Sequence, residues 1–452
     1  MRIAILGGGG FRVPLLARAL ASEPAEVAEL ALYDPDAARM AHVAAVARAF
    51  APGLPIRETT VAADAVRGSR FVIASIRVGG QRARAHDERV CGDAGILGQE
   101  TVGAGGAALA LRNVPAMLRL ARIVDREAPD ATLVNYTNPV GMVTDALIAE
   151  TGVETVGICD TPAETAERAA RLLYLDPEAC VPGWSGINHL GWLTALYEPS
   201  DDPGDPFPPV DRLRDLYRDP ERLERVHRPG LFPLEAFAGA VPSEYVFYHR
   251  YPERAARRAR QAAKTRGAAI LEFEERLFAA PGRGDPAEAY QRALAEREGS
   301  YFAIETGASK RDGPTRFQAP VASGYDRIGL AVVRARSGGS GAGEVLVVNT
   351  RNRTPVGGPA VPELPTGDVV EVASRVDGDG VRPIAQPPLP PADAALLRRV
   401  RAAEKEIARA AVVTDVARAS EALREHPAGG RRAAAILPRL RVPREPSGRS
   451  RG

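Results

Sequence analysis

The first 160 residues alternate between short apolar segments and alanine-rich stretches with helical periodicity. This alternation predicts a parallel sheet with helices on both faces, because strands buried on both sides are apolar throughout. We therefore expect an α/β fold that begins with a Rossmann-like, doubly wound sheet. The predicted strands are Arg2 to Leu6, Glu29 to Tyr33, Phe71 to Ser75, Thr132 to Asn135 and Thr155 to Ile158.

The pattern changes after about residue 190. Asp201 to Pro209 is rich in Asp and Pro, which indicates a surface loop, and arginine- and alanine-rich helices are expected from Pro252 through Phe278. Strand-like segments return at Gly329 to Val333 and Glu344 to Asn349. These segments predict a mixed α+β second domain with a small sheet of its own.

The C-terminal part is expected to be helical. A proline-rich connector, Pro383 to Pro391, precedes a last helical segment from Asp393 to Arg424. The final residues, 441–452, contain Pro, Gly, Ser and Arg with almost nothing to bury, so we expect a disordered tail.

Composition and charge narrow the class of protein. A chain of 452 residues with a formal charge of +2 and interspersed charges is not typical of a nucleic-acid or membrane partner. No apolar run reaches the roughly 18 residues of a transmembrane helix, so we expect a cytoplasmic enzyme. Three scattered cysteines, Cys91, Cys159 and Cys180, do not form a disulfide framework.

A glycine-rich loop follows the first predicted strand. Gly7, Gly8, Gly9 and Gly10 stand where a backbone must approach a pyrophosphate at a helix N-terminus, although Arg12 occupies the place of the usual third glycine. Asp34 closes the second strand, where a carboxylate accepts hydrogen bonds from the adenosine ribose and favours NAD over NADP. We therefore expect an NAD-binding Rossmann-like domain over 1–170 and a catalytic and oligomerisation domain over 171–440.

Several polar clusters interrupt the apolar segments and suggest a site. Cys159 and His189 could be ligands that leave open positions on a divalent metal, or simply a buried cysteine and a satisfied histidine. The polar clusters around them favour a ligand-binding site, because burying so many polar groups is costly unless a substrate pairs with them. The clusters are Arg77 to Glu88, Gly98 to Gly106, Asn135 to Gly141, Gly157 to Pro162 and Gly186 to Trp192.

These clusters together resemble glycoside hydrolase family 4, the NAD-dependent glycosidases. The most specific agreements are the stretch from Arg77 to Glu88 and the four short motifs Gln99-Glu100-Thr101, Thr137-Asn138-Pro139, Cys159-Asp160 and Asn188-His189-Leu190. The resemblance implies NAD as cofactor and a divalent metal, manganese in most members, held by Cys159 and His189. It also implies a homodimer or homotetramer.

The resemblance further implies a mechanism. NAD oxidises sugar C3, a tyrosine removes the C2 proton, and the aglycone leaves by elimination. Tyr245 in Pro242-Ser-Glu-Tyr245 matches the family's tyrosine, with Tyr248 as the fallback, and Asp160 is the candidate acid. A tyrosine of pKa ~10 is a poor base at neutral pH, so a cation must lie nearby.

The resemblance also implies a 6-phosphorylated sugar glycoside as substrate. Arg84, Glu100 and Asn138 match positions that touch the sugar, and Arg266 matches an arginine suited to a phosphate, although it could also be a solvated helix arginine. Asp160 is typical of 6-phospho-α-glucosidases, whereas three longer motifs favour a 6-phospho-β-glucosidase, which we expect. A metal-independent 2-hydroxy acid dehydrogenase and a non-catalytic NAD sensor are the alternatives.

Overall fold

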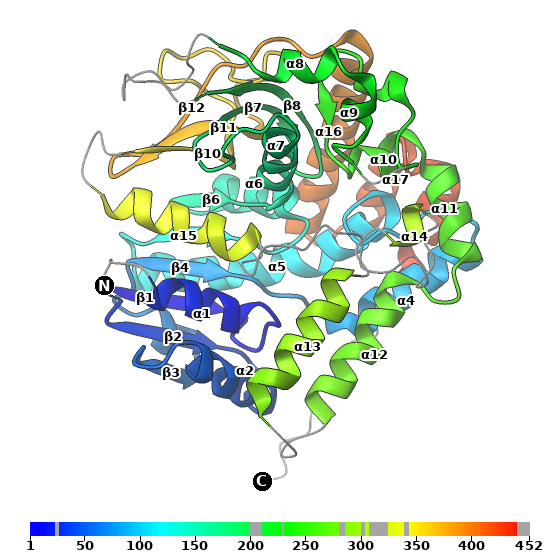
Figure 1. The fold of residues 1–452 in the computed structure, drawn as a ribbon. Coiled ribbons are helices and arrows are strands. Elements are labelled where there is room, and N and C mark those ends of the chain that lie inside the picture. Colours follow the sequence, from blue (N-terminus) through cyan, green and yellow to red (C-terminus); the bar gives the residue numbers. More distant parts are fainter. Residues whose placement is uncertain are drawn as a thin grey trace.

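The computed structural model describes residues 1–22, 27–198, 210–227, 230–279, 285–299, 303–306, 324–338 and 343–440. One mixed sheet of 12 strands runs through this part of the chain (Figure 1). Its strand order is β3-β2-β1-β4-β5-β6-β10-β11-β7-β8-β9, and β12 pairs with β11. The predicted loop from Asp201 to Pro209 and the predicted tail 441–452 lie outside the described residues.

The first six strands are parallel and have the order of a dinucleotide-binding sheet. All five predicted strands are confirmed to within one residue, whereas β3 was not predicted because this half-buried strand at the sheet edge carries Arg57 and Glu58. The six strands are β1 (Arg2–Leu6), β2 (Glu29–Tyr33), β3 (Ile56–Thr59), β4 (Phe71–Ala74), β5 (Thr132–Asn135) and β6 (Thr155–Gly157).

The strands of the C-terminal half extend this same sheet. Strand β10 pairs antiparallel with β6, so the expectation of a separate small sheet was wrong. The predicted strand at Glu344 to Asn349 is confirmed as β10. These strands are β7 (Val181–Ile187), β8 (Leu190–Tyr197), β9 (Val241–Pro242), β10 (Glu344–Arg351), β11 (Val369–Asp377) and β12 (Gly380–Pro383).

Helices cover both faces of the parallel strands. Ile3 and Ile5 pack toward α1, α2 and α15, while Ala4 and Leu6 pack toward α5, α6 and α16. This alternation explains why the strand is apolar throughout. The helices of the first half are α1 (Val13–Ala21), α2 (Ala37–Phe50), α3 (Ala62–Val66), α4 (Gly80–Asp93), α5 (Gly103–Glu127), α6 (Val140–Glu150) and α7 (Thr161–Leu172).

The predicted helices between Pro252 and Phe278 are confirmed as α11 and α12, but the strand predicted from Gly329 to Val333 was wrong, since these residues belong to α15. The last predicted helical segment divides into α16 and α17. The remaining helices are α8 (Leu213–Tyr217), α9 (Pro220–Glu224), η1 (Leu234–Phe237), α10 (Val246–Arg250), α11 (Pro252–Gln261), α12 (Arg266–Ala279), α13 (Pro286–Gly299), α14 (Ala303–Thr306), α15 (Gly324–Ser337), α16 (Pro391–Val412), α17 (Val416–Glu425), α18 (Gly430–Ile436) and η3 (Leu437–Leu440).

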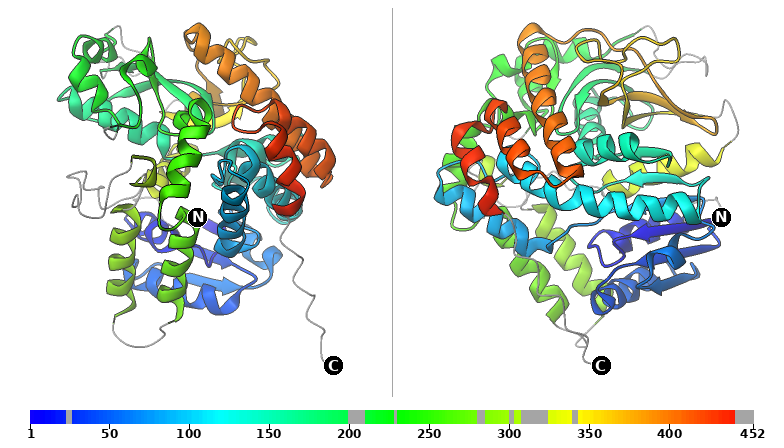
Figure 2. Two further views of the ribbon diagram at one scale, coloured as in Figure 1. Left: turned by 90° about the vertical axis from the view of Figure 1, so that its right-hand side faces the viewer. Right: turned by 180° about the vertical axis from the view of Figure 1, so that it is seen from behind.

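Helices α12 and α13 bring the C-terminal half of the chain against the dinucleotide-type sheet. Helix α12 contacts α4, and α13 contacts α2 (Figures 1 and 2). The ring of Phe11, just after the glycine loop, stacks on Tyr290 of α13 and meets Phe273 of α12 edge-on. Within the described ranges, no helix has the length and apolarity needed to cross a membrane.

Candidate active site

One cavity of about 1560 Å³ opens at the carboxyl ends of the parallel strands, the edge where open α/β sheets bind ligands. Gly8, Cys159 and His189 lie outside its lining, and Cys159 and His189 are buried in the neighbouring structure. Ten predicted site residues meet in the lining, namely Gly7, Gly9, Gly10, Asp34, Arg84, Glu100, Asn138, Asp160, Tyr245 and Arg266.

The glycine loop forms one end of this cavity, between β1 and α1. Gly7 has a φ of +100°, and a Cβ there would lie 2.3 Å from the carbonyl oxygen of Ser75. A Cβ on Gly8 would lie 2.8 Å from the Cβ of Leu32. The close packing therefore requires glycine, and it leaves a thin loop that a pyrophosphate can approach.

Asp34 follows β2 beside this loop. Its carboxylate accepts hydrogen bonds from the backbone amides of Gly9 (2.9 Å) and Asp36 (3.0 Å). Two such bonds fix the carboxylate and leave further acceptor capacity for ribose hydroxyls. The loop and Asp34 together fit the adenosine and pyrophosphate parts of a dinucleotide.

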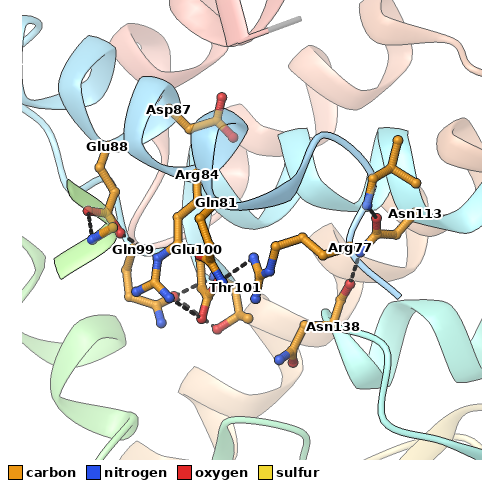
Figure 3. A network of polar contacts seen from close by, with 12 residues as sticks. Arg77, Gln81, Arg84, Asp87, Glu88, Gln99, Glu100, Thr101, Asn113 and Asn138 are labelled. Carbon is orange, nitrogen blue, oxygen red and sulfur yellow. Dashed lines mark hydrogen bonds and ion pairs between the residues drawn. The ribbon is translucent and has the colours of Figure 1, made fainter. Parts of the chain in front are cut away.

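A buried ion network forms a second wall of the cavity (Figure 3). The Glu100 carboxylate pairs with Arg77 at 2.6 Å and with Arg84 at 3.0 Å, and Arg84 also pairs with Glu88 at 2.8 Å. Burial would raise the pKa of Glu100, but Arg77 and Arg84 outweigh it and lower this pKa to about 2. Glu100 is therefore a fixed negative charge that can accept hydrogen bonds from a polar ligand.

Asn138 lies three residues after β5 and lines the same cavity. Its carbonyl oxygen accepts a hydrogen bond of 2.6 Å from the side-chain amide of Asn113. Its buried Oδ1 has no hydrogen-bond partner among the described residues. Because an unpaired buried acceptor is costly, this atom fits a ligand that donates a hydrogen bond.

The segments that carry Cys159 and His189 are joined by one row across the sheet. Gly157 of β6 pairs with Asn349 of β10, Asn349 pairs with Glu371 of β11, and Glu371 pairs with Gly186 of β7. Cys159 comes two residues after Gly157, past the end of β6, and His189 comes three residues after Gly186, past the end of β7, which runs in the opposite direction to β6. Burial and the charge of Glu371 raise the pKa of Cys159, so the Glu371 carboxylate of this row lies within electrostatic reach of Cys159 and also contacts Asn188, the neighbour of His189.

The Glu371 side chain reinforces this row. Its carboxylate accepts hydrogen bonds from Asn349 (3.1 Å), Asn188 (3.2 Å) and the indole of Trp184 (3.2 Å). Sequence reasoning missed Glu371, although an acidic residue in the apolar segment Val369-Val370-Glu371-Val372 is a signal that could have found it. Glu371 holds the residue next to His189 in place.

His189 is oriented by a chain of hydrogen bonds. Gln99 Oε1 accepts from both the backbone amide (2.6 Å) and the hydroxyl (2.9 Å) of Thr101, and Thr101 Oγ1 lies 2.7 Å from His189 Nδ1. Since the hydroxyl proton points to Gln99, His189 must donate from Nδ1, which leaves Nε2 without a proton. Burial lowers the pKa of His189 to about 4, so the ring is neutral near pH 7. A neutral ring with a free Nε2 fits a metal ligand.

This arrangement predicts that Thr101→Val weakens metal binding. Valine has the shape of threonine but cannot accept the Nδ1 proton, so the ring loses its fixed tautomer. We expect the affinity for Mn²⁺ to fall about 10- to 100-fold, as when other partners of ligating histidines are removed. Titration of the purified protein with Mn²⁺ measures this, and Thr101→Ser should bind as tightly as the unchanged protein. Equal affinity in the valine variant would contradict the assignment.

One tyrosine stacks on His189, and a second lies next to that tyrosine. The Tyr245 ring stacks on the His189 ring with centroids 3.8 Å apart and an angle of 8° between the planes. Burial lowers the pKa of Arg84, whereas Glu100, Glu88 and Tyr245 raise it, so a cation lies within electrostatic reach of Tyr245. The Tyr248 hydroxyl instead donates to Glu305 at 2.6 Å, and burial and Glu305 raise the pKa of Tyr248. Of the two tyrosines, Tyr245 is thus the better-placed candidate for the base.

Cationic side chains line the cavity around the start of α12. Arg266 begins α12, lines the cavity and donates to the backbone oxygen of Arg297 at 3.4 Å. Arg260 and Lys264 line the same region, and sequence reasoning did not single them out. Such a group of cations suits a phosphate dianion.

The fold and this cavity place the protein among enzymes built on a Rossmann-type dinucleotide-binding sheet. Two family models match the chain: "Family 4 glycosyl hydrolase" over residues 2–175 and "Family 4 glycosyl hydrolase C-terminal domain" over residues 184–428. The chain belongs to family 4 of the glycosyl hydrolases. The resemblance inferred from the motifs is confirmed.

The curated relatives include proteins named for the α-anomer and proteins named for the β-anomer of a phosphorylated glucoside. The chain is 27% identical to a probable 6-phospho-beta-glucosidase of Bacillus subtilis over 426 residues, 92% of this chain and 89% of that protein. It is 32% identical to a maltose-6'-phosphate glucosidase of Bacillus subtilis over 204 residues, 43% of this chain and 45% of that protein. The latter match, like several others, spans about half the length of the relative.

Solved structures share the fold over nearly the whole chain. The 6-phospho-beta glucosidase of Thermotoga maritima with manganese, NAD+ and glucose-6-phosphate superimposes with a TM-score of 0.77 at 22% identity, covering 97% of each chain. A 6-phospho-alpha-glucosidase from gut microorganisms in complex with NAD and Mn²⁺ gives 0.76 at 22% identity, again over 97% of each chain. This likeness establishes the α/β, Rossmann-type architecture.

Proposed function

We propose that the protein is an NAD- and divalent-metal-dependent 6-phospho-β-glucosidase. The observation that carries the proposal is a single cavity that contains the glycine loop, Asp34, Tyr245 and the cations around Arg266. A glycoside with its phosphate against Arg266 could therefore present its ring to a nicotinamide. Relatives that are named for phosphorylated glucosides support this substrate class.

The proposed roles follow from the family resemblance and are supported by the geometry of the site. Bound NAD would take up and return the hydride of sugar C3, and a manganese ion would stabilise negative charge on the oxygens at C2 and C3. Cys159 and His189 would hold the metal. Among the described residues, no three His, Cys, Asp or Glu side chains are grouped to hold a metal, so substrate oxygens would complete its coordination.

The chain's own residues would then carry the proton transfers. Tyr245 removes the C2 proton, and Asp160, which lines the same cavity, protonates the departing glycosidic oxygen. Arg84, Glu100 and Asn138 hold the sugar hydroxyls. The burial of the ion network keeps water from competing for these groups.

Parallel assays with the two anomers test the substrate. We expect p-nitrophenyl β-glucoside 6-phosphate to be hydrolysed in the presence of NAD and Mn²⁺, and the α-anomer to be turned over at least about tenfold more slowly, a difference of ~1.4 kcal/mol. The unphosphorylated β-glucoside is the matched control for the phosphate. Exclusive turnover of the α-anomer would assign the protein to the 6-phospho-α-glucosidases. An aspartate at position 160 is typical of that group.

A chelator separates this proposal from a dehydrogenase. Hydrolysis should stop when the metal is removed with EDTA and return when Mn²⁺ is added, and no net NADH should accumulate because the hydride returns to the sugar. Continuous NADH production from a 2-hydroxy acid without metal would overturn the proposal. The family assignment already favours the hydrolase.

A further inference from the structure

Arg39 lies beside the carboxylate expected to bind the adenosine ribose. It is in the first turn of α2, and its Nε donates to the carbonyl oxygen of Gly9 at 2.8 Å. Gly9 also donates its amide to Asp34, so Arg39 and Asp34 flank the same glycine. Both side chains line the cavity.

Part of the Arg39 guanidinium is already engaged, and the side chain remains 33% exposed. One terminal nitrogen donates to Glu274 Oε2 at 3.0 Å, and the guanidinium carbon lies 4.2 Å from the centre of the Phe278 ring. Both partners belong to α12, which comes from the other half of the chain. Arg39 thus contacts α12 as well as the glycine loop.

Glu274 is well placed to hold this arginine. Its side chain is only 5% exposed, and its second oxygen accepts from the Gln81 amide at 3.2 Å and lies 4.0 Å from Arg297. A buried carboxylate with several polar contacts keeps its position and its charge interacts strongly with a neighbouring cation. Glu274 therefore neutralises Arg39 within a fixed geometry.

The pairing of Arg39 with Glu274 affects which dinucleotide the site can bind. NADP differs from NAD by a phosphate on the adenosine 2′-oxygen, and Rossmann-type proteins that accept NADP use an arginine near that oxygen. Arg39 occupies such a place, next to Asp34. An arginine whose charge is compensated by a carboxylate offers little attraction to a phosphate dianion.

We propose that Glu274 is a specificity-determining residue that excludes 2′-phosphorylated dinucleotides by sequestering Arg39. Asp34 repels the 2′-phosphate directly, and Glu274 removes the cation that could offset this repulsion. The inference rests on the dinucleotide binding in the proposed function. It assigns to α12 a role in cofactor choice in addition to the phosphate-binding role proposed for Arg266.

Binding measurements on Glu274→Gln test the proposal. The glutamine keeps the size of the side chain but releases the charge of Arg39. Calorimetric titration with NAD and NADP should show the Kd for NADP falling about five- to tenfold relative to that for NAD, the range between an exposed and a charge-assisted ion pair. The gain should shrink at high salt. An unchanged ratio of the two Kd values would overturn the proposal.

Two further variants make this test specific. Glu275→Gln removes the same charge one residue away, where the side chain is 51% exposed and pairs with Arg82, and should leave the ratio unchanged. Adding Arg39→Gln to Glu274→Gln should abolish the gain for NADP. If the gain persists in the double variant, Arg39 is not its source and the proposal is wrong.

Arg39→Gln alone covers the case in which Glu274→Gln does not fold. With Glu274 present, Arg39 should contribute little to 2′-phosphate binding, so this variant should change the ratio of the two Kd values less than about twofold. A larger loss of NADP affinity would show that Arg39 already binds the phosphate and would refute the sequestration. Failure of the unchanged protein to bind NAD at all would refute the proposed function as well.

Discussion

Tyr245→Phe should lower the rate of glycoside hydrolysis about 10²- to 10⁴-fold, the usual contribution of a general base. Phenylalanine keeps the stack on His189 but lacks the hydroxyl that would remove the C2 proton. The variant should therefore bind NAD and Mn²⁺ normally. Exchange of the C2 proton with deuterium from solvent, followed by NMR, should be lost together with hydrolysis.

Tyr248→Phe is the matched control for this prediction. Tyr248 neighbours Tyr245, with ring centroids 5.8 Å apart, but its hydroxyl is committed to Glu305. We expect this variant to retain C2 exchange, with a smaller loss of rate. If Tyr248→Phe abolishes exchange while Tyr245→Phe retains it, the roles of the two tyrosines are reversed.

The parallel half of the fold was predictable because its signals are local. A strand covered on both faces is apolar over its whole length, so five of six strands could be read directly from the sequence. The edge strand β3 does not obey this rule, because its residues are only half-buried. It therefore has no continuous apolar run.

The wrong strand at Gly329 to Val333 shows the limit of short apolar runs. In isolation, Gly329-Leu-Ala-Val-Val333 resembles a strand, but Ile328, Val332 and Ala335 recur at helical spacing and are buried as one face of α15. The joining of the C-terminal strands to the parallel strands in one sheet could not be predicted either, for a different reason. Pairing between β6 and β10 joins residues 192 positions apart.

The residues of the candidate site also fall into two groups, those that a local pattern predicts and those that depend on distant partners. Loop residues at strand ends, such as Asp34 and Asn138, are found from their position after an apolar segment. Glu371 and Glu274 act through partners from distant parts of the chain, Asn188 and Arg39, so no local motif contains both members of a pair. Sequence reasoning therefore found residues that stand in local motifs but missed partners such as Glu371 and Glu274, which hold neighbouring side chains in place.

Cys159→Ser should sharply weaken the binding of Mn²⁺ and, with it, hydrolysis. A serine hydroxyl keeps its proton near pH 7 and cannot replace a thiolate as a ligand. The loss should exceed the roughly 10- to 100-fold effect of removing a residue that only orients a ligand. Electron paramagnetic resonance of free Mn²⁺ measures the affinity, and binding of NAD should be unchanged because the glycine loop and Asp34 are untouched.

Cys91→Ser supplies the control, since Cys91 is equally buried but lies on α4, outside the row that joins β6 to β7. It should lose stability without a specific loss of metal affinity. Because Cys159 and His189 are proposed to hold one metal, Cys159→Ser and Thr101→Val should weaken the same site and their effects should not be additive. A Cys159→Ser variant that binds Mn²⁺ as tightly as the unchanged protein would remove Cys159 from the metal site and leave His189 to act without it.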